Sequence, residues 1–210
     1  MIRPEGLAGV AFGEASDGDG RSDPVVRTDI SAALGISDEW AVVRQVHGAD
    51  VAVADVPGGL GDADGIVTTT SGLPIAIGIA DCLPVVLQGD GGVGIAHAGW
   101  RGAAAGVVAA VSQAMDRMGA PARRAAIGPG IGPCCFEVGS EVAERFPGSV
   151  RTTTWGTTSV DLVDAVRSQL GDVDDVWVHG GCTHHEDVFH SFRRDGSPQR
   201  QVAVAWVPSV

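Results

Sequence analysis

The sequence contains no lysine, tyrosine or asparagine, so all 14 of its Lys and Arg positions are arginines. The missing lysine excludes Schiff-base chemistry, a lysine general base and a P-loop, because each of these needs a lysine amine. Positive charge is also scarce, since 26 Asp and Glu residues leave a net charge of −12. We therefore expect small-molecule partners, with no nucleic acid and no anionic membrane among them.

Long apolar runs and a cysteine framework are missing as well. Gly, Asp and His interrupt every hydrophobic stretch, so no segment has the length of a membrane span. The amino-terminal residues lack the basic start and the apolar run of a secretory signal. The four cysteines, two of them adjacent, do not form the pattern of a disulfide scaffold. The sequence thus predicts a cytoplasmic protein whose thiols are free or bind a metal.

The hydrophobic pattern predicts a mixed α/β fold. Strands are expected at residues 40–46, 51–56, 74–79, 84–87, 93–97, 124–127, 175–179, 188–192 and 201–207. Helices are expected at residues 29–34, 103–118, 140–146 and 159–170. Because strands outnumber helices and follow one another in runs, we predict an α/β layered sandwich with mixed sheets and flanking helices. Residues 1–210 are expected to form a single domain, with a loop-rich segment at 1–23.

Three reactive side chains lie at the ends of predicted strands, namely His47, Cys82 and His97. A buried strand ordinarily excludes such groups unless they are paired, ligated or catalytic. Two imidazoles and a thiolate can hold zinc and leave its fourth position open to water, as in catalytic sites. Asp81 or Asp64 would then orient a ligating imidazole. A core thiol with two hydrogen-bonded histidines explains the same residues equally well, because the spacing alone is not specific.

Arg101 follows a Gly-Trp pair at the start of a predicted helix, where its guanidinium and the free N–H groups together would bind phosphate. A merely solvated arginine is disfavoured there, because the amino terminus of a helix repels cations. Cys182 and Thr183 follow a Gly-Gly turn at a strand end, which makes them candidates for lining a pocket. Cys134 and Cys135 are expected to be structural.

Several motifs occur together along the chain: Gln45-Val-His-Gly, Ala80-Asp-Cys-Leu-Pro, His97-Ala-Gly-Trp-Arg-Gly, and the Gly-, Pro- and Cys-rich run at 127–137. In these motifs the sequence resembles the purine nucleoside phosphorylases formerly called laccase-domain or polyphenol-oxidase-like proteins. That family includes the bacterial peptidoglycan editing factor. The motifs extend over nearly the whole chain after the first forty residues.

The resemblance implies an α/β sandwich that binds Zn²⁺ through His47, Cys82 and His97. It also implies phosphorolysis of adenosine, inosine and S-methyl-5′-thioadenosine, with some adenosine deamination. The small-molecule partners would then be a purine nucleoside and phosphate. The catalytic residues expected on this basis are the three ligands and Asp81. The substrate-binding residues expected are Asp64, Arg101, Cys182, Thr183 and Arg193.

Two other functions stay open on the sequence alone. A Cys82 thiolate activated by His97 would hydrolyse an amide, for instance in mis-made cell-wall precursors. A closed four-ligand zinc site would instead staple a non-catalytic interaction module. Multicopper oxidation is disfavoured, because it needs more imidazoles than the six histidines present and because no His-x-His pair occurs.

The chain departs from the family pattern near both ends. The region before Gln45 is short and rich in Asp and Gly, which puts pocket contacts from that end in doubt. Phe192 stands where the family tends to have tyrosine, and residues 197–200 replace a Thr-Gly-Arg segment. The lost hydroxyl is expected to alter substrate preference.

Overall fold

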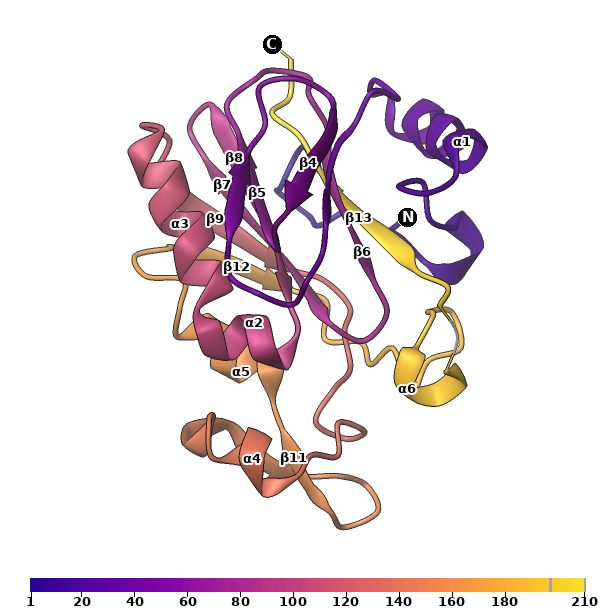
Figure 1. Ribbon diagram of the computed structural model, residues 1–210, viewed down its shortest axis with the longest axis vertical. Helices are drawn as coiled ribbons and strands as arrows, with labels where there is room; N and C mark the ends of the chain where they lie inside the picture. Colours follow the sequence, from indigo (N-terminus) through magenta and orange to yellow (C-terminus); the bar gives the residue numbers. More distant parts are fainter. Residues whose placement is uncertain (197, 210) are drawn as a thin grey trace.

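The computed structural model, which describes residues 1–196 and 198–209, consists of two stacked β-sheets with helices on both outer faces (Figure 1). The five-stranded sheet has the order β1-β13-β6-β2-β4. Its strands are β1 (Val10–Phe12), β13 (Gln201–Ala205), β6 (Ile75–Ile79), β2 (Ala41–Arg44) and β4 (Gly58–Asp62). The first two pairs in this order are antiparallel and the last two are parallel.

The six-stranded sheet has the order β12-β9-β7-β8-β5-β3. Its strands are β12 (Asp175–Val178), β9 (Ala122–Ile127), β7 (Leu83–Gly89), β8 (Gly92–Ala98), β5 (Gly65–Thr68) and β3 (Val51–Val53). The two outer pairs are parallel and the three central pairs are antiparallel. A separate hairpin joins β10 (Val150–Thr152) and β11 (Thr158–Val160) at the lower end of Figure 1. The predicted α/β sandwich with mixed sheets is confirmed.

Alternation along the strands builds the core between the sheets. Successive strand residues point to opposite faces, so Ile75, Ile77 and Ile79 of β6 pack together toward the other sheet. Val86 of β7 meets them from the six-stranded sheet. Ala76 points the other way, into the layer beneath α1 (Pro24–Leu34). The regular alternation therefore decides which residues separate the two sheets and which support the helices.

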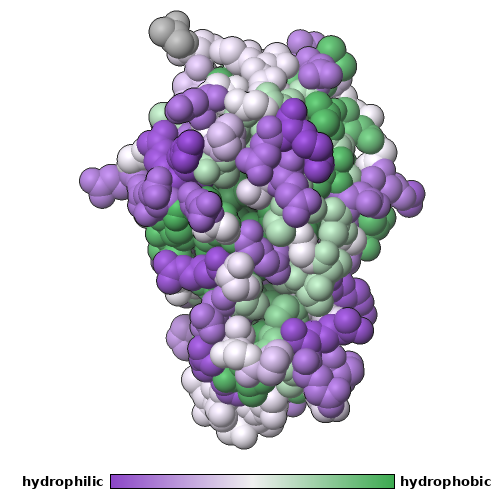
Figure 2. All heavy atoms as spheres, turned by 90° about the vertical axis from the view of Figure 1, so that its left-hand side faces the viewer, coloured by the Kyte–Doolittle hydropathy of each residue, from purple (hydrophilic) through white to green (hydrophobic). Residues whose placement is uncertain are grey.

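Helices cover the outer faces of the two sheets. Helix α1 packs on the five-stranded sheet around Trp40, while α2 (Trp100–Ala105), α3 (Val107–Arg117) and α5 (Leu162–Arg167) pack on the six-stranded sheet. Figure 1 shows α1 and α3 on opposite sides of the molecule. Seen from the α3 side, hydrophilic side chains are spread over the surface with hydrophobic atoms between them (Figure 2). The shorter helices are η1 (Ala15–Asp17), α4 (Ser140–Ala143), η2 (Pro147–Ser149) and α6 (Phe192–Asp195).

Two expected helices differ in the structure because of local capping. The helix expected at 103–118 is divided at Gly106, whose left-handed backbone (φ 83°) ends α2 and precedes α3. The helix expected from Ser159 begins later, since Ser159 lies in β11 and the Asp161 side chain caps α5 by accepting the Asp164 N–H.

Other boundaries shift for similar reasons. The strand expected at 188–192 is wrong, because Ser191 caps the short helix α6 and Val188 is exposed in a turn. Helix α1 starts at Pro24, before the expected residue 29, since Asp23 accepts two N–H bonds at its start. Gly139 precedes α4, so Ser140 is its first residue and not its cap.

Over residues 1–196 and 198–209, the structure contains no helix with the length and hydropathy needed to span a membrane.

Candidate active site

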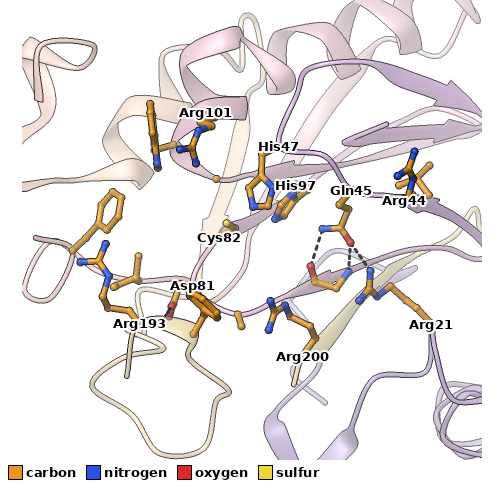
Figure 3. Close-up of a pocket in the computed structure, with 18 residues that line it drawn as sticks. Arg21, Arg44, Gln45, His47, Asp81, Cys82, His97, Arg101, Arg193 and Arg200 are labelled. Atoms are coloured by element: carbon orange, nitrogen blue, oxygen red, sulfur yellow. Dashed lines mark hydrogen bonds between the residues drawn. The ribbon is translucent and has the colours of Figure 1, made fainter. Parts of the chain in front are cut away.

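His47, Cys82 and His97 come together where three strand ends meet (Figure 3). His47 follows β2, Cys82 lies between β6 and β7, and His97 is near the end of β8. Their ligand atoms all lie within 4.8 Å of one another, and the two imidazole ring centroids are 4.9 Å apart. Strand ends remote in sequence thus place two nitrogen donors and one sulfur donor around one point.

Asp64 lies directly behind this cluster and has no exposed surface. Its Oδ1 lies 2.8 Å from Nδ1 of His97 and accepts the His47 backbone N–H at 3.0 Å. Its Oδ2 accepts the backbone N–H groups of Val46 and Gly48 at 3.1 and 2.6 Å. The carboxylate therefore orients the His97 ring and holds the loop that carries His47. With Nδ1 engaged, Nε2 of His97 is the nitrogen available for a metal.

Backbone strain is concentrated at the ligands. Among the residues that the structure describes, His47 (φ 62°) and Asp81 (φ 82°) are the two non-glycine residues with a left-handed backbone. Such conformations persist at functional sites when the surrounding contacts determine them. Close packing also matters at Gly99, where a Cβ atom would lie only 2.7 Å from the Cys82 sulfur. The left-handed backbone at His47 and Asp81 and the close approach of Gly99 to Cys82 thus help to bring the three donors to one point.

The electrostatics of the cluster favour a thiolate. Burial raises the pKa of Cys82, but the charge of His97 and hydrogen bonds from both histidines outweigh it and lower this pKa to about 6. Burial lowers the pKa of His97, whereas Cys82 and Asp64 raise it to about 9. The pKa of Asp64 stays below its ordinary value despite burial, because His97 and the backbone of Gly48 and Val46 donate to it. The thiolate is the form of cysteine that binds metals and acts as a nucleophile.

A cavity of about 630 Å³ opens onto the cluster. Its charged lining is mostly positive, and Asp81 is the one carboxylate among the described residues that line it. The arginines that line it are Arg21, Arg44, Arg101, Arg193 and Arg200, and the large aromatic residues are Trp100, Phe136 and Phe192. Figure 3 shows arginines on both sides of the histidine pair. The cavity is therefore suited to an anion and a flat ring.

Arg101 and Arg193 occupy one side of the cavity (Figure 3). The Arg101 guanidinium lies 4.4 Å from the Trp100 ring centroid, and the part of the chain that the structure describes offers it no ion-pair partner. Arg193 donates from Nη1 to the Glu137 carbonyl at 2.9 Å and lies 5.4 Å from the Phe136 ring centroid. Arg101 is thus available for an anion, and Arg193 is held against an aromatic wall.

Asp81 links the cavity to the residues behind it. Its Oδ1 accepts the Thr183 hydroxyl and its Oδ2 accepts the Arg193 backbone N–H, both at 2.7 Å. Thr183 is fully buried, and neither it nor Cys182 is among the cavity-lining residues. Asp64, which lies behind His97, is also fully buried and does not line the cavity. Direct contacts of Cys182, Thr183 and Asp64 with a substrate therefore remain predictions. In the structure, Thr183 holds Asp81 and Asp64 holds His97, both of which line the cavity.

Comparison with known proteins places the site in a family. Residues 18–208 match the family model described as multi-copper polyphenol oxidoreductase laccase. The chain belongs to this family. A purine nucleoside phosphorylase of Deinococcus radiodurans is 39% identical over 214 residues, covering 96% of this chain and 83% of the relative. The purine nucleoside phosphorylase ORF3 of Streptomyces griseus is 37% identical over 222 residues, covering 96% and 90%.

Solved structures share the family fold. YlmD from Geobacillus stearothermophilus superposes with a TM-score of 0.81 at 30% identity, covering 91% of this chain and 82% of that one. YfiH from Bacillus licheniformis has a TM-score of 0.83 at 24% identity, covering 94% and 92%, and shows the fold alone. The resemblance inferred from the sequence motifs is confirmed by these comparisons.

The candidate metal ligands give little support to the multicopper oxidation that the family description names. Of the six histidines, only His47 and His97 belong to a candidate metal cluster within the described residues. A multicopper centre needs more imidazoles than this. The names of the phosphorylase relatives agree better with one cluster of two imidazoles and one thiol beside an arginine-lined cavity.

Both departures from the family pattern border the cavity. Arg21 reaches it from the short amino-terminal segment and donates from Nη1 to Gln45 Oε1 at 2.6 Å, while Gln45 also bonds both backbone groups of Gly78 (Figure 3). A Cβ on Gly78 would lie 2.2 Å from the Arg21 Cζ. Phe192 and Arg200 also line the cavity, with Arg200 near Arg21 (Figure 3), whereas Ser197 falls outside the described residues.

Sequence reasoning missed several residues of the cavity wall. Arg21 carries no local signal, because its loop has the composition of many surface loops. Gln45 belongs to the Gln45-Val-His-Gly motif, but the sequence suggested no role for it. Phe136 directly follows the paired cysteines and was likewise given no role. The usable hints were the motif around Gln45 and the run at 127–137 that contains Phe136.

Proposed function

We propose that this protein is a zinc-dependent purine nucleoside phosphorylase that acts on adenosine, inosine and S-methyl-5′-thioadenosine. One observation carries the proposal: the cluster of His47, Cys82 and His97 faces a cavity whose charged lining is dominated by arginines. The chain's relatives that carry this activity in their names support it. A neutral nucleoside and a phosphate anion together match an aromatic and positively charged cavity.

The donor set fits zinc. Two imidazoles and one thiolate within 4.8 Å of one another correspond to a three-ligand catalytic site, and Asp64 supplies the carboxylate partner typical of a ligating histidine. Bound there, zinc would act as a Lewis acid toward an oxygen or nitrogen of the substrate. His47, Cys82 and His97 would hold it, and the cavity would leave room for substrate beside it.

The residues of the chain supply binding and orientation. In phosphorolysis a phosphate oxygen forms a bond to C1′, the C1′–N9 bond breaks with its electron pair on N9, and the proton lost by phosphate ends on the purine. Arg101 would hold the phosphate, because its guanidinium is positioned by Trp100 without an acidic partner. Asp81 would keep Arg193 and the wall at Phe136 in place through its bond to the Arg193 N–H.

The test is a phosphate-dependence assay on the zinc-loaded protein. Adenosine with phosphate should give adenine and ribose 1-phosphate in equal amounts, and omitting phosphate should stop base release. The same chromatograms would reveal the implied deamination as inosine and ammonia. Absence of base release in the presence of zinc and phosphate would refute the proposal.

A second candidate function is amide hydrolysis by Cys82. It is favoured by the contacts that link Asp64 to His97 and His97 to Cys82. A carboxylate that orients an imidazole beside a thiolate is the arrangement of a cysteine hydrolase. In this case Cys82 Sγ would attack an amide carbonyl and His97 would protonate the leaving amine. Removing the metal separates the candidates, because chelation should abolish phosphorolysis but activate an amide hydrolase.

A metal-stapled interaction module is the third alternative. It needs four protein ligands, whereas the described residues bring three donors together at this cluster. An exchangeable water on the bound metal would exclude it.

A further inference from the structure

A second cluster of metal-binding side chains lies away from the cavity. The sulfur atoms of Cys134, Cys135 and Cys182 all lie within 4.8 Å of one another, and those of Cys134 and Cys135 are 3.3 Å apart. All four cysteines of the chain are free thiols. Within the described residues this cluster consists of thiols alone, whereas the one at His97 combines two imidazoles with one thiol.

Backbone contacts hold the three thiols together. The Gly132 N–H donates to Cys182 Sγ at 3.2 Å, although the two residues are 50 positions apart. The Thr183 N–H donates to the Gly130 carbonyl and the Cys135 N–H to the Gly132 carbonyl, both at 3.0 Å. Backbone hydrogen bonds between two distant segments therefore bring the three thiols together, and one of these bonds is accepted by the Cys182 sulfur.

Without a metal ion, burial and mutual repulsion disfavour the thiolate forms of Cys134 and Cys135. Burial, followed by the adjacent thiols, raises the pKa of Cys134 to about 12. Burial also raises the pKa of Cys135, and Cys182 and Asp81 add to it by charge repulsion. A bound cation reverses this balance, because a coordinating thiol is deprotonated outright.

We propose that Cys134, Cys135 and Cys182 bind one soft, thiophilic metal ion such as Cu(I) through their three sulfur atoms. Sulfur-only donor sets select soft ions over hard ones. Three thiolates about 2.3 Å from a common ion lie roughly 4.0 Å apart, which is longer than the 3.3 Å between the Cys134 and Cys135 sulfur atoms and shorter than the 4.8 Å within which all three lie. Each thiol that binds releases one proton, and no oxidation is involved. The site is independent of the proposed phosphorolysis.

The partly exposed Cys134 makes the cluster accessible, and binding of an ion there would affect the neighbouring cavity wall. Cys134 is partly exposed, and a cavity of about 200 Å³ is lined by Gly132 and Gly181 beside the cluster. A bound ion would tie the segment carrying Phe136, which lines the larger cavity, to the segment carrying Thr183, which holds Asp81. Ion binding would therefore stiffen the wall behind the candidate active site.

The test is an anaerobic titration of the full chain with Cu(I), in the presence of a phosphine reductant and a competing Cu(I) chelator. Because copper also binds His and Cys, the parent protein is Cys82→Ser, which disables the first cluster and retains the other three thiols. We expect this variant to bind one Cu(I), with X-ray absorption showing sulfur neighbours only. Binding of no copper, or nitrogen neighbours at the metal, would overturn the proposal.

Two further substitutions locate the ion. Adding Cys182→Ser, or separately Cys134→Ser, to the Cys82→Ser chain should weaken Cu(I) binding at least tenfold. Cys134 is partly exposed, so its variant decides the question if Cys182→Ser fails to fold by circular dichroism. A folded Cys134 variant with undiminished Cu(I) affinity would overturn the proposal. So would a disulfide between Cys182 and either neighbour that the reductant leaves intact, because it would remove the donors.

Discussion

Within the described residues, two clusters of three donors each have their ligand atoms within 4.8 Å of one another, but their surroundings differ. His47, Cys82 and His97 face a cavity of about 630 Å³, and a fully buried carboxylate orients one of the imidazoles. The other cluster consists of thiols alone and is held by backbone N–H and carbonyl groups. The Glu186 carboxylate accepts the Cys182 backbone N–H at 2.8 Å, and the charge of Asp81 raises the pKa of Cys135.

This difference shows that the groups around the donors decide the chemistry of a cluster. Charge from His97 lowers the pKa of Cys82 to about 6, whereas burial and neighbouring thiols raise that of Cys134 to about 12. In the proposed function, the first cluster therefore has a thiolate ready to bind a metal beside the cavity. The second needs a metal to become ionised, and the cavity wall separates it from any substrate.

The largest expected effect is on activity at the first cluster. His97→Ala should reduce kcat/KM for adenosine phosphorolysis by at least ~100-fold, since a preorganised electrostatic group typically contributes 10² to 10³ in rate. His185→Gln is the matched control, because His185 is exposed and outside both clusters, and it should retain activity. Comparable activity in the two variants would remove the metal cluster from the mechanism.

Asp64→Asn tests whether the buried carboxylate strengthens zinc binding at the first cluster, which would set it apart from the thiol cluster. Loss of the charge that orients His97 should weaken zinc binding by about 10- to 100-fold, measured by chelator competition. Asp62→Asn is the control, because Asp62 pairs with Arg44 at the surface, where such pairs contribute little. Equal zinc affinity in both variants would show that the Asp64 contact does not tune the site.

Arg101→Gln tests the assignment of the anion. Removing one charge-assisted contact, worth about 1.5–3 kcal/mol, should raise the KM for phosphate roughly tenfold or more. The KM for adenosine should change less. Arg117→Gln at the end of α3 serves as the control, since Arg117 does not line the cavity. An unchanged KM for phosphate in Arg101→Gln would mean that phosphate binds elsewhere.

The smallest effect is expected at the second cluster. Cys134→Ser should leave zinc-supported phosphorolysis within about twofold and change the free energy of unfolding by less than about 0.5 kcal/mol, as for most partly exposed sites. Cys135→Ser should cost more, about 1–3 kcal/mol, because it buries a hydroxyl. Urea titrations measure both values, and a Cys134→Ser chain that lost phosphorolysis would join the two clusters functionally.

Regular patterns made much of the fold predictable. The alternation that separates Ile75, Ile77 and Ile79 from Ala76 is a local signal, and it correctly places β6 between two layers. The division of the helix at Gly106 was missed, because apolar residues keep their spacing across it. The segment at 188–192 reads as a strand but has no strand partner among the described residues, and strand formation requires one.

The candidate site was predictable in part. His47, Cys82 and His97 are rare residue types at element ends, and Arg101 stands in a distinctive Gly-Trp-Arg-Gly motif, so all four are conspicuous in the sequence. Arg21 is not, because its place in the cavity depends on the packing of a loop against Gly78. Cys182 was expected to line a pocket, but the structure places it beside Cys134 and Cys135.

The sequence by itself determined which donors exist, on which kind of element they lie, and that the protein has no lysine for catalysis. Only the tertiary structure decided which donors share a cluster, that Asp64 contacts His97, and that Cys182 does not line the arginine-rich cavity. The physical reason is that side-chain periodicity is a local property of the chain, whereas convergence depends on how the two sheets stack and where their connecting loops meet.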